Sequence, residues 1–498
     1  MQQIQRRFYS GSGFSDWEIG DVTIILHNGV YHLFHLIIPN HDYIAHAVSK
    51  DCISWKRVKN ALFVGDPGEW DDDMLWTMHV YKTADGFEMY YTGLQRKLRG
   101  TNSLIGRAFS KDLYHWEKKN EGVFPIESKG PYYESVENNP RKWLSFRDPF
   151  RFDYNNQTYF LVCARVSHGP ISRRGCIGLL QYHENKVTYL PPLHFPMVYD
   201  DLECPCIFQL NGRHYIIASI REDVKVRYWF SSDILGEYHA FHSNVLLPQG
   251  NYAARVVESK NGKLLIYSFF YTSGMINSYR VFLPPKQLDT DDRGRLLLKS
   301  FDHWEEVAYD AVQQNQFSTV KQLFNNPTAT FIKEDNRWVM GSRSGYEIFV
   351  FEKPADDFIW EGVISVEGMG KLGLVTDMDE EGSGYYFAFD VINGHVELRA
   401  WGFNDADIRS NFKFKVLQDN VFTINPKYTY HFKLIRYGNY IELVIDGLVK
   451  LTLIDYTYSN QYIGLYSASS VVSLNNSFIK KLPPLEDEYL SDQDIFLN

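Results

Sequence analysis

Three acidic residues stand at matching distances before turn signals in the chain. Asp21 and Asp148 each precede an asparagine of a turn by seven residues, and Glu203 precedes another by eight. Carboxylates that converge can cleave a glycosidic bond, because one stays ionised as nucleophile or base while another carries a proton for the leaving oxygen. The third can bind sugar hydroxyls. The spacing therefore indicates that these three side chains are catalytic candidates.

Three carboxylates could also bind a cation such as Ca²⁺ or Mg²⁺. The chain has no Asp-x-Asp-x-Asp-Gly loop, however, and the run Asp71-Asp72-Asp73 lacks that spacing. We interpret this run as a polar loop, and we expect neither a metal nor a cofactor.

The elements that must position the carboxylates form a repeat. Five turns of Asn/Asp and Gly type each precede a strand rich in Tyr and Phe, at intervals of about 50 to 70 residues, and such turns mark hairpins. This interval is the length of a four-stranded propeller blade with its loops. The pattern predicts a five-bladed β-propeller over residues 1–335. The five turns are Asn28-Gly29, Asp85-Gly86, Asn155-Asn156, Asn211-Gly212 and Asn261-Gly262.

The remainder of the chain has a different pattern. Beyond about residue 340, short alternating strands continue without the phasing of the blades. They predict a β-sandwich over residues 340–498, and thus an all-β protein of two domains. The one helix-like periodicity covers residues 308–323, where we expect a short helix or connector.

The composition limits the partners and the compartment. The 498 residues carry a net charge of −10 without a Lys/Arg-rich block, so nucleic-acid binding has little electrostatic support. No apolar run could span a membrane, and no secretory signal is visible. The five cysteines lack a zinc-like spacing and fit reduced thiols. We expect a cytoplasmic protein whose partner is a carbohydrate substrate, with the oligomeric state left open.

Several local sequences are similar to those of a known family. Phe146-Arg147-Asp148-Pro149 and Glu203-Cys204-Pro205 resemble the Arg-Asp-Pro and Glu-Cys motifs of glycoside hydrolase family 32, the family of invertases, inulinases and levanases. Three further segments resemble its other motifs in the same order: Ala45–Trp55, Tyr90–Gly93 and Tyr252–Arg255. The resemblance implies a retaining, exo-acting hydrolase of β-fructofuranosides or related furanosides, with a C-terminal β-sandwich.

The resemblance also implies a role for each candidate. Asp21 would be the nucleophile, Glu203 the general acid/base, and Asp148 the stabiliser of the transition state. A substrate-binding shell would comprise Arg147, Trp76, His46, Cys204 and Tyr252. Three tryptophans flank the expected mouth of the site and could stack on a sugar or pack under loops: Trp17, Trp70 and Trp76.

Two other functions stay open at this point. Related five-bladed families act on arabinosides, xylosides or galactosides. A non-catalytic carbohydrate-binding protein is the second alternative, but it would not need all three carboxylates, so their presence favours an enzyme.

The chain departs from the family pattern around the expected sugar ring. Gly20 replaces an asparagine before Asp21, and Leu36-Ile37-Ile38 replaces a segment that contains glutamine. In the second blade Trp76-Thr77-Met78-His79 replaces a Phe-Ser-Gly-Ser stretch. The first two changes remove polar side chains that would pair sugar hydroxyls, and Met78 and His79 are expected to narrow the pocket.

We therefore predict poor activity on sucrose and inulin, and better activity on another furanoside or a modified fructoside. The measurement is hydrolysis of sucrose, inulin and levan at matched concentration. A kcat/KM for sucrose of about 10⁴ M⁻¹s⁻¹ or more would contradict the prediction, because that value is common among enzymes on their own substrates.

Overall fold

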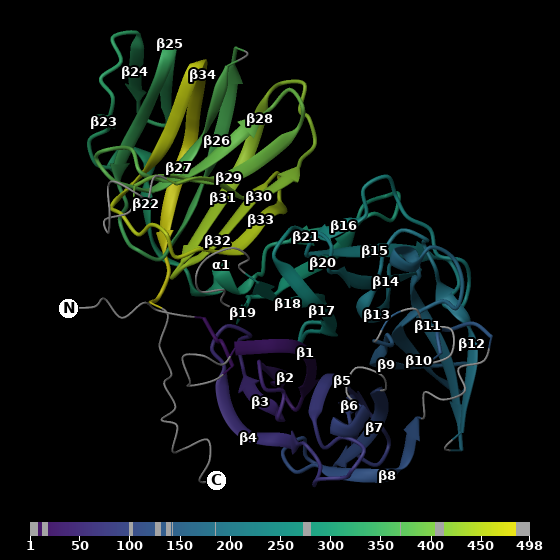
Figure 1. Ribbon diagram of the computed structural model, residues 1–498. Coiled ribbons are helices and arrows are strands. Elements are labelled where there is room, and N and C mark those ends of the chain that lie inside the picture. Colours follow the sequence, from purple (N-terminus) through teal and green to yellow (C-terminus); the bar gives the residue numbers. More distant parts are fainter. Residues whose placement is uncertain are drawn as a thin grey trace. The chain divides into compact units, whose positions relative to one another are not determined.

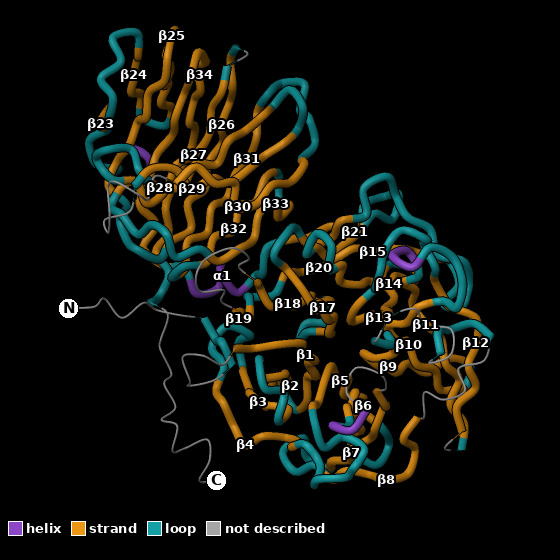
Figure 2. The backbone as a smooth tube through the Cα atoms, viewed as in Figure 1, coloured by secondary structure: helices purple, strands orange, loops and turns teal. Residues whose placement is uncertain are grey.

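The structure is a computed structural model and describes residues 8–11, 18–98, 103–124, 131–135, 141, 143–184, 186–271, 280–368, 370–403 and 413–484. Within these ranges the regular structure is almost entirely β, which confirms the predicted fold class (Figure 2). The chain divides into two compact units, one over Phe8–Leu297 and one over Leu298–Asp487. None of the helices in the described ranges is long and apolar enough to cross a membrane.

The first unit is the five-bladed β-propeller. Five antiparallel sheets follow one another along the chain, and the first strands of the sheets are neighbours around a common axis (Figure 1). The first three blades are β1 (Glu18–His27), β2 (Val30–Ile38), β3 (Tyr43–Ser49) and β4 (Lys56–Phe63); β5 (Met74–Lys82), β6 (Phe87–Leu94), β7 (Ser103–Ser110) and β8 (Glu117–Phe124); and β9 (Phe146–Tyr154), β10 (Gln157–Arg165), β11 (Gly175–His183) and β12 (Lys186–His194).

The last two blades complete the ring. The fourth blade comprises β13 (Glu203–Leu210), β14 (Arg213–Ile220), β15 (Lys225–Ser231) and β16 (Val245–Leu247). The fifth comprises β17 (Asn251–Glu258), β18 (Leu264–Tyr271), β19 (Arg280–Phe282), β20 (Lys286–Thr290) and β21 (Leu296–Lys299). This blade meets the first one through the Tyr267 hydroxyl, which donates to Cys52 Sγ over 3.2 Å, and through Lys260 Nζ, which donates to the Lys50 carbonyl over 2.7 Å.

The predicted turns lie between the first two strands of each blade. Asn28, Asn155 and Asn211 have φ angles of 48° to 50°. Asparagine and glycine adopt this left-handed backbone at little cost, and two-residue hairpins require it. The turn residues therefore fix where each blade begins.

Each innermost strand carries a β-bulge near its start, where two strands of the blade lose register. The shifts lie between Ile19 and Val22, Trp76 and Met78, Arg147 and Phe150, Glu203 and Cys206, and Tyr252 and Arg255. A bulge adds a residue to one strand and turns a side chain away from the regular alternation. Three bulge residues have left-handed φ angles: Asp148 at 61°, Cys204 at 53° and Ala253 at 50°.

The bulges link neighbouring blades by hydrogen bonds. The backbone N–H of Asp148 donates to Thr92 Oγ1 of the second blade over 3.1 Å, and that of Cys204 donates to Asp148 Oδ2 over 2.9 Å. The N–H of Ala253 donates to Ser219 Oγ of the fourth blade over 2.8 Å. Adjacent inner strands are thus held in register at the level of the candidate carboxylates.

The described residues of the second unit form thirteen strands in one hydrogen-bonded network. They are β22 (Tyr309–Gln313), β23 (Lys321–Gln322), β24 (Ala329–Glu334), β25 (Arg337–Glu352), β26 (Phe358–Glu367), β27 (Lys371–Met378), β28 (Gly384–Asp390), β29 (His395–Gly402), β30 (Lys413–Val421), β31 (Thr429–Tyr437), β32 (Tyr440–Ile445), β33 (Leu448–Ile454) and β34 (Tyr462–Lys481).

Two long strands make this network a sandwich. Along β34, the first half pairs with β27 and the second half pairs with β26, while β25 accompanies both halves. Register between β25 and β34 breaks between Ser342 and Tyr346, opposite Ser469, whose φ is 56°. Strands that bend at such a break can pass from one layer to the other, so the two layers share β25 and β34.

One prediction needs correction here. The boundary lies at residues 297–298, not at residues 335–340, because β22 pairs with β34 and both β23 and β24 pair with β25. Residues 308–323 form a connector with a 3-10 helix at Gln314–Gln316 between β22 and β23. Gln314 donates its side-chain amide to the Leu474 carbonyl and accepts the Ser477 N–H, so this connector is bonded to β34. The α-helix of the described chain is α1 (His303–Val307).

We predict that Thr92→Val destabilises the propeller by about 1–3 kcal/mol, because it leaves the buried Asp148 N–H without an acceptor at nearly constant volume. Denaturant unfolding measures the change. Thr158→Val is the matched control, since its hydroxyl donates to Asp153 at an exposed position. Equal stability of the two variants would contradict a role for the bulge hydrogen bond.

Candidate active site

The structure brings the three predicted carboxylates together. Asp21 and Asp148 lie in the bulges of β1 and β9, and Glu203 begins β13 directly before its bulge. The charges of Asp21 and Glu203 both act on Asp148. Thr77, the extra residue in the bulge of β5, donates its hydroxyl to Asp21 Oδ2. The four inner strands therefore direct acidic or hydroxyl groups to one place.

Asp148 lies in an environment that disfavours its ionised form. Only 2% of the residue is exposed. Burial raises the pKa of Asp148 to about 6; the Arg147 guanidinium opposes this effect, and the charges of Asp21 and Glu203 reinforce it. Crowding of negative charge at a buried place has this consequence in general.

Glu203 has the opposite balance. Its Oε1 accepts from Arg147 Nη2 over 2.6 Å and from Arg221 Nη2 over 2.5 Å, and its Oε2 accepts from the Tyr252 hydroxyl. Burial raises the pKa of Glu203, but Arg147 and Arg221 and the hydroxyl of Tyr252 outweigh it, so that the pKa lies below its ordinary value. The two acids of β9 and β13 are thus shifted apart, as in sites that assign different protonation states to paired carboxylates.

Arg147 connects the acids through several contacts at once. Its guanidinium donates to Ser145 Oγ over 2.5 Å, to Asp201 Oδ2 over 3.2 Å and to Glu203, and its Nε lies 3.8 Å from Asp148 Oδ1. With its side chain 6% exposed, it is a fixed positive charge. It therefore contacts Glu203 and at the same time forms a buried ion pair with Asp201.

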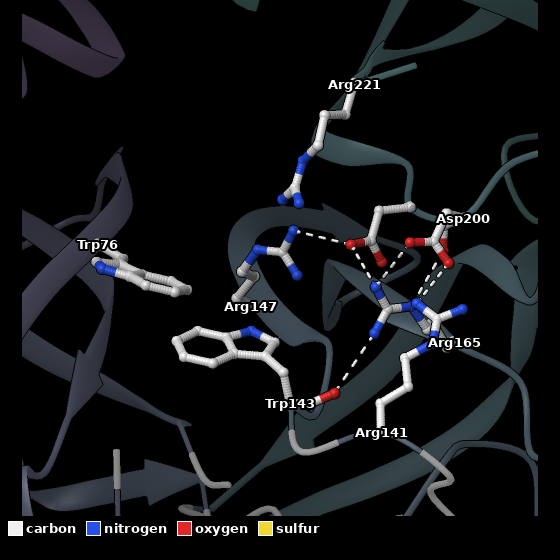
Figure 3. Close-up of a pocket in the computed structure, with 8 residues that line it drawn as sticks. Trp76, Arg141, Trp143, Arg147, Arg165, Asp200 and Arg221 are labelled. Atoms are coloured by element: carbon white, nitrogen blue, oxygen red, sulfur yellow. Dashed lines mark hydrogen bonds and ion pairs between the residues drawn. The ribbon is translucent and has the colours of Figure 1, made fainter. Parts of the chain in front are cut away.

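A cavity of about 360 Å³ opens beside this cluster (Figure 3). Its lining comprises Trp76, Arg141, Trp143, Arg147, Arg165, Asp200, Asp201 and Arg221. The rings of Trp76 and Trp143 stack at 5.1 Å with 23° between their planes. The tryptophans and the arginine–carboxylate network form different parts of the wall, which suits a sugar with apolar ring faces and polar edges.

Of the other residues predicted for the substrate-binding shell, three lie at the site and one does not. Trp76 lines the cavity and Tyr252 contacts Glu203. Cys204 contributes its backbone N–H to Asp148, while burial raises the pKa of its thiol well above the ordinary value. His46 lies away from the site, because it belongs to β3, two strands out from β1. It is fully buried there, stacks on Phe34 at 4.3 Å and shares a 3.0 Å hydrogen bond with His32.

Two of the flanking tryptophans do not contribute to this cavity. Trp70 stacks on Tyr91 at 5.5 Å, and its ring fills the space that Gly93 and Gly106 leave open. From the loop between β4 and β5 it therefore packs against β6 and β7. Trp17 lies outside the described residues.

The departures from the family pattern are largely matters of packing. Met78 and Ile37 are fully buried in hydrophobic clusters, so neither narrows a pocket. His79 stacks on Phe150 at 4.0 Å and accepts the backbone N–H of Arg151. The expected narrowing by Met78 and His79 is therefore wrong. Thr77 between Trp76 and Met78 is the residue that reaches the carboxylates.

Gly20 is required by its neighbours. A Cβ atom at this position would lie 2.9 Å from Leu36 Cβ and 3.0 Å from Ile38 Cδ1. An asparagine would force these side chains to move. The two departures from the family pattern, Gly20 and the apolar segment of β2, therefore depend on each other.

Sequence reasoning missed several residues of the site. Asp201, buried to 3% exposure, accepts from Ser145, Arg147 and Arg165. Neither Asp201 nor Arg221 belongs to a repeat signal. The Asp200-Asp201 pair directly upstream of Glu203 was the one available hint.

In the part of the chain that the structure describes, no three His, Cys, Asp or Glu side chains are grouped so that they could hold a metal ion.

The chain is similar in sequence to known proteins. Residues 21–282 match the model of the glycosyl hydrolases family 32 N-terminal domain. A fructan beta-fructosidase of Streptococcus mutans is 26% identical over 238 residues, which cover 44% of this chain, and a levanase of Bacillus sp. (strain L7) is 32% identical over 149 residues, which cover 28%. Each match covers 15% of the length of the relative.

A solved structure shows the same fold over both units. The fructan 1-exohydrolase IIa of Cichorium intybus matches with a TM-score of 0.72 at 15% identity, covering 98% of this chain and 99% of that one. The family match extends over more than half of the sequence and includes all three carboxylates. The chain belongs to glycosyl hydrolase family 32.

Proposed function

We propose that the chain hydrolyses β-fructofuranosides or closely related furanosides from the terminal unit, with retention of anomeric configuration. The observation that carries this proposal is the acid cluster: a buried, arginine-bound Glu203 on the inner strand next to that of Asp148, with the charge of Asp21 close enough to act on Asp148. The relatives support it, since they are a fructan beta-fructosidase and a levanase, and the Cichorium enzyme has been crystallised with 1-kestose.

Asp21 acts as the nucleophile in this proposal. Its carboxylate attacks the anomeric carbon, and the bond to the leaving oxygen breaks while Glu203 gives that oxygen a proton. The Thr77 hydroxyl binds one oxygen of Asp21 and leaves the other for attack. Glu203 then removes a proton from the water that releases the sugar, so the ionised form of Glu203 serves the second step.

Asp148 acts as the acceptor for ring hydroxyls. One oxygen is held by the Cys204 N–H, and the other lies near Arg147. An ionised Asp148 accepts strong charge-assisted hydrogen bonds, which grow as positive charge develops on the sugar ring.

Poor activity on sucrose and inulin remains part of the proposal. It now depends only on the loss of polar groups at position 20 and in β2, and no longer on a narrowed pocket. Gly20 still lacks the amide that a fructosyl ring would meet at this position, and Leu36 and Ile37 supply no polar group in its place.

Asp21→Asn and Glu203→Gln are each expected to lower kcat on a cleaved fructoside by two to four orders of magnitude, roughly the range for a lost acid/base or nucleophile. With β-fructosyl fluoride, whose leaving group needs no proton, Glu203→Gln should release a rapid first equivalent of fluoride and then slow down, because the second step still lacks its base, while Asp21→Asn should release no rapid equivalent. Asp153→Asn is the control, an exposed carboxylate farther along β9. NMR of the first-formed product should show the β anomer. An inverted product, or near-normal hydrolysis of the fructoside by either variant, would contradict the assignment.

Wild-type activity is expected to fall as the pH drops through about 6, because Asp148 then takes up a proton and stops accepting as an anion. The raised pKa also has a consequence for stability. Between the ordinary pKa near 4 and the folded value near 6, the unfolded chain ionises first. The wild type therefore loses stability relative to Asp148→Asn as the pH rises through this window, by on the order of 2 kcal/mol.

Thermal unfolding of both proteins at pH 4.5 and 7 measures this difference. Asp153→Asn should behave like the wild type. Parallel pH dependences of the wild type and Asp148→Asn would show that Asp148 has an ordinary pKa.

A further inference from the structure

Two arginines with very different surroundings share one oxygen of Glu203. The Arg147 side chain is 6% exposed and is fixed by Ser145 and Asp201. The Arg221 side chain is 68% exposed and lies in the turn after β14. Among the described residues, Glu203 is the one hydrogen-bond partner of Arg221. Arg147 is therefore a permanent partner of the acid, and Arg221 is a partner that can leave.

The contact with Arg221 is unfavourable for a proton donor. Glu203 faces Arg147 from β9, Arg221 from the turn after β14 and the Tyr252 hydroxyl from β17. The negative charges nearby are those of Asp21, Asp148 and Asp201. Two guanidinium groups on one oxygen favour the carboxylate form, which suits removal of a proton from water but not donation to a leaving oxygen.

Arg221 lines the cavity, where its guanidinium can donate hydrogen bonds to a bound molecule. The lining carries four guanidinium groups against the carboxylates of Asp200 and Asp201. Arg165 and Arg141 are both paired with Asp200, and Arg165 and Arg147 with Asp201. Arg221 is thus the arginine of this wall with exposed donor groups (Figure 3). Because Glu203 protonates the leaving oxygen, a cavity at its side receives the leaving group.

We propose that the leaving group of the natural substrate carries an anionic substituent, a phosphate or a carboxylate, which draws Arg221 away from Glu203 and so converts Glu203 into the proton donor. The inference rests on the proposed function. On binding, the hydrogen bond from Arg221 to Glu203 breaks and one to the anion forms. Glu203 takes up a proton from water, and that proton passes to the leaving oxygen when the glycosidic bond breaks. A neutral leaving group leaves Arg221 in place and is cleaved slowly.

The binding experiment needs no catalysis. Calorimetry measures the affinity of the wild type, Arg221→Gln and Arg295→Gln for glucose, glucose 6-phosphate and glucuronate. Arg295 is a matched control, because it is exposed and pairs with a single carboxylate, Asp291, in the turn between β20 and β21. At least one anionic sugar should bind the wild type and Arg295→Gln about tenfold or more tightly than glucose, which is within reach of one charge-assisted hydrogen bond. Arg221→Gln should lose this advantage.

The two anionic probes distinguish the chemistry of the substituent, since the one that binds more tightly identifies phosphate or carboxylate. Equal binding of glucose and both anions by the wild type would overturn the proposal. An advantage that persists in Arg221→Gln would overturn it as well.

The kinetic experiment tests the exchange. On neutral sucrose, Arg221→Gln should move the alkaline limb of kcat/KM to higher pH, because Glu203 loses one of its two positive neighbours and holds its proton longer. The ratio of kcat/KM for sucrose 6-phosphate to that for sucrose should fall at least tenfold in Arg221→Gln and stay constant in Arg295→Gln. An unmoved alkaline limb would show that Arg221 does not govern the acid. If the chain cleaves no fructoside, the proposed function fails, while the binding experiment still decides whether an anion site exists.

Discussion

The site depends on holding like charges together in a buried place. Asp148 and Glu203 lie on neighbouring inner strands, and Asp21 is close by. The negative charges of Glu203 and Asp21 both raise the free-energy cost of ionising Asp148. The fold offsets this repulsion with fixed donors at the bulges: the Cys204 N–H on Asp148, the Thr77 hydroxyl on Asp21 and the guanidinium of Arg147 between the acids. Without the bulges, the regular alternation of side chains along each strand would turn these groups away from one another.

The same bulges explain why the two acids differ so much in protonation. Asp148 is inside its bulge, where its oxygens meet backbone N–H and one edge of Arg147. Glu203 precedes its bulge and reaches outward to two arginines and a tyrosine. A shift of one residue in position along equivalent strands therefore separates an acid that is difficult to ionise from one that ionises easily. Catalysis by paired carboxylates needs such a difference.

The sequence predicted what local chemistry determines. Asn-Gly turns require a left-handed backbone, so they located the blades, and counting back from the turns located Asp21, Asp148 and Glu203. Family motifs added Arg147 and Tyr252, whose side chains both donate hydrogen bonds to Glu203.

Contacts between distant segments could not be predicted in this way. In the second blade we expected Met78 and His79 at the pocket, whereas the bulge of β5 directs Thr77 to Asp21. Arg221 and Asp201 reach the site from connections between strands, which carry no repeat signal. His46 belonged to a family motif but occupies a strand too far from the axis. The domain boundary depends on the pairing of β22 with β34, in which Tyr309 lies opposite Lys481, and no local sequence pattern records a contact over such a separation.

The packing around Gly20 has a consequence for how this site can change its specificity. Since a Cβ atom there would collide with Leu36 and Ile38, a polar residue cannot be introduced at position 20 alone without displacing the second strand. A smaller residue at position 38 would relieve only part of this collision, because the nearest atom is the Cβ of Leu36 at 2.9 Å, which every residue except glycine carries. A side chain at position 20 therefore also requires β1 and β2 to move apart. The chain is thereby confined to its present ring-binding surface by the geometry of two adjacent strands, whatever sugar it meets.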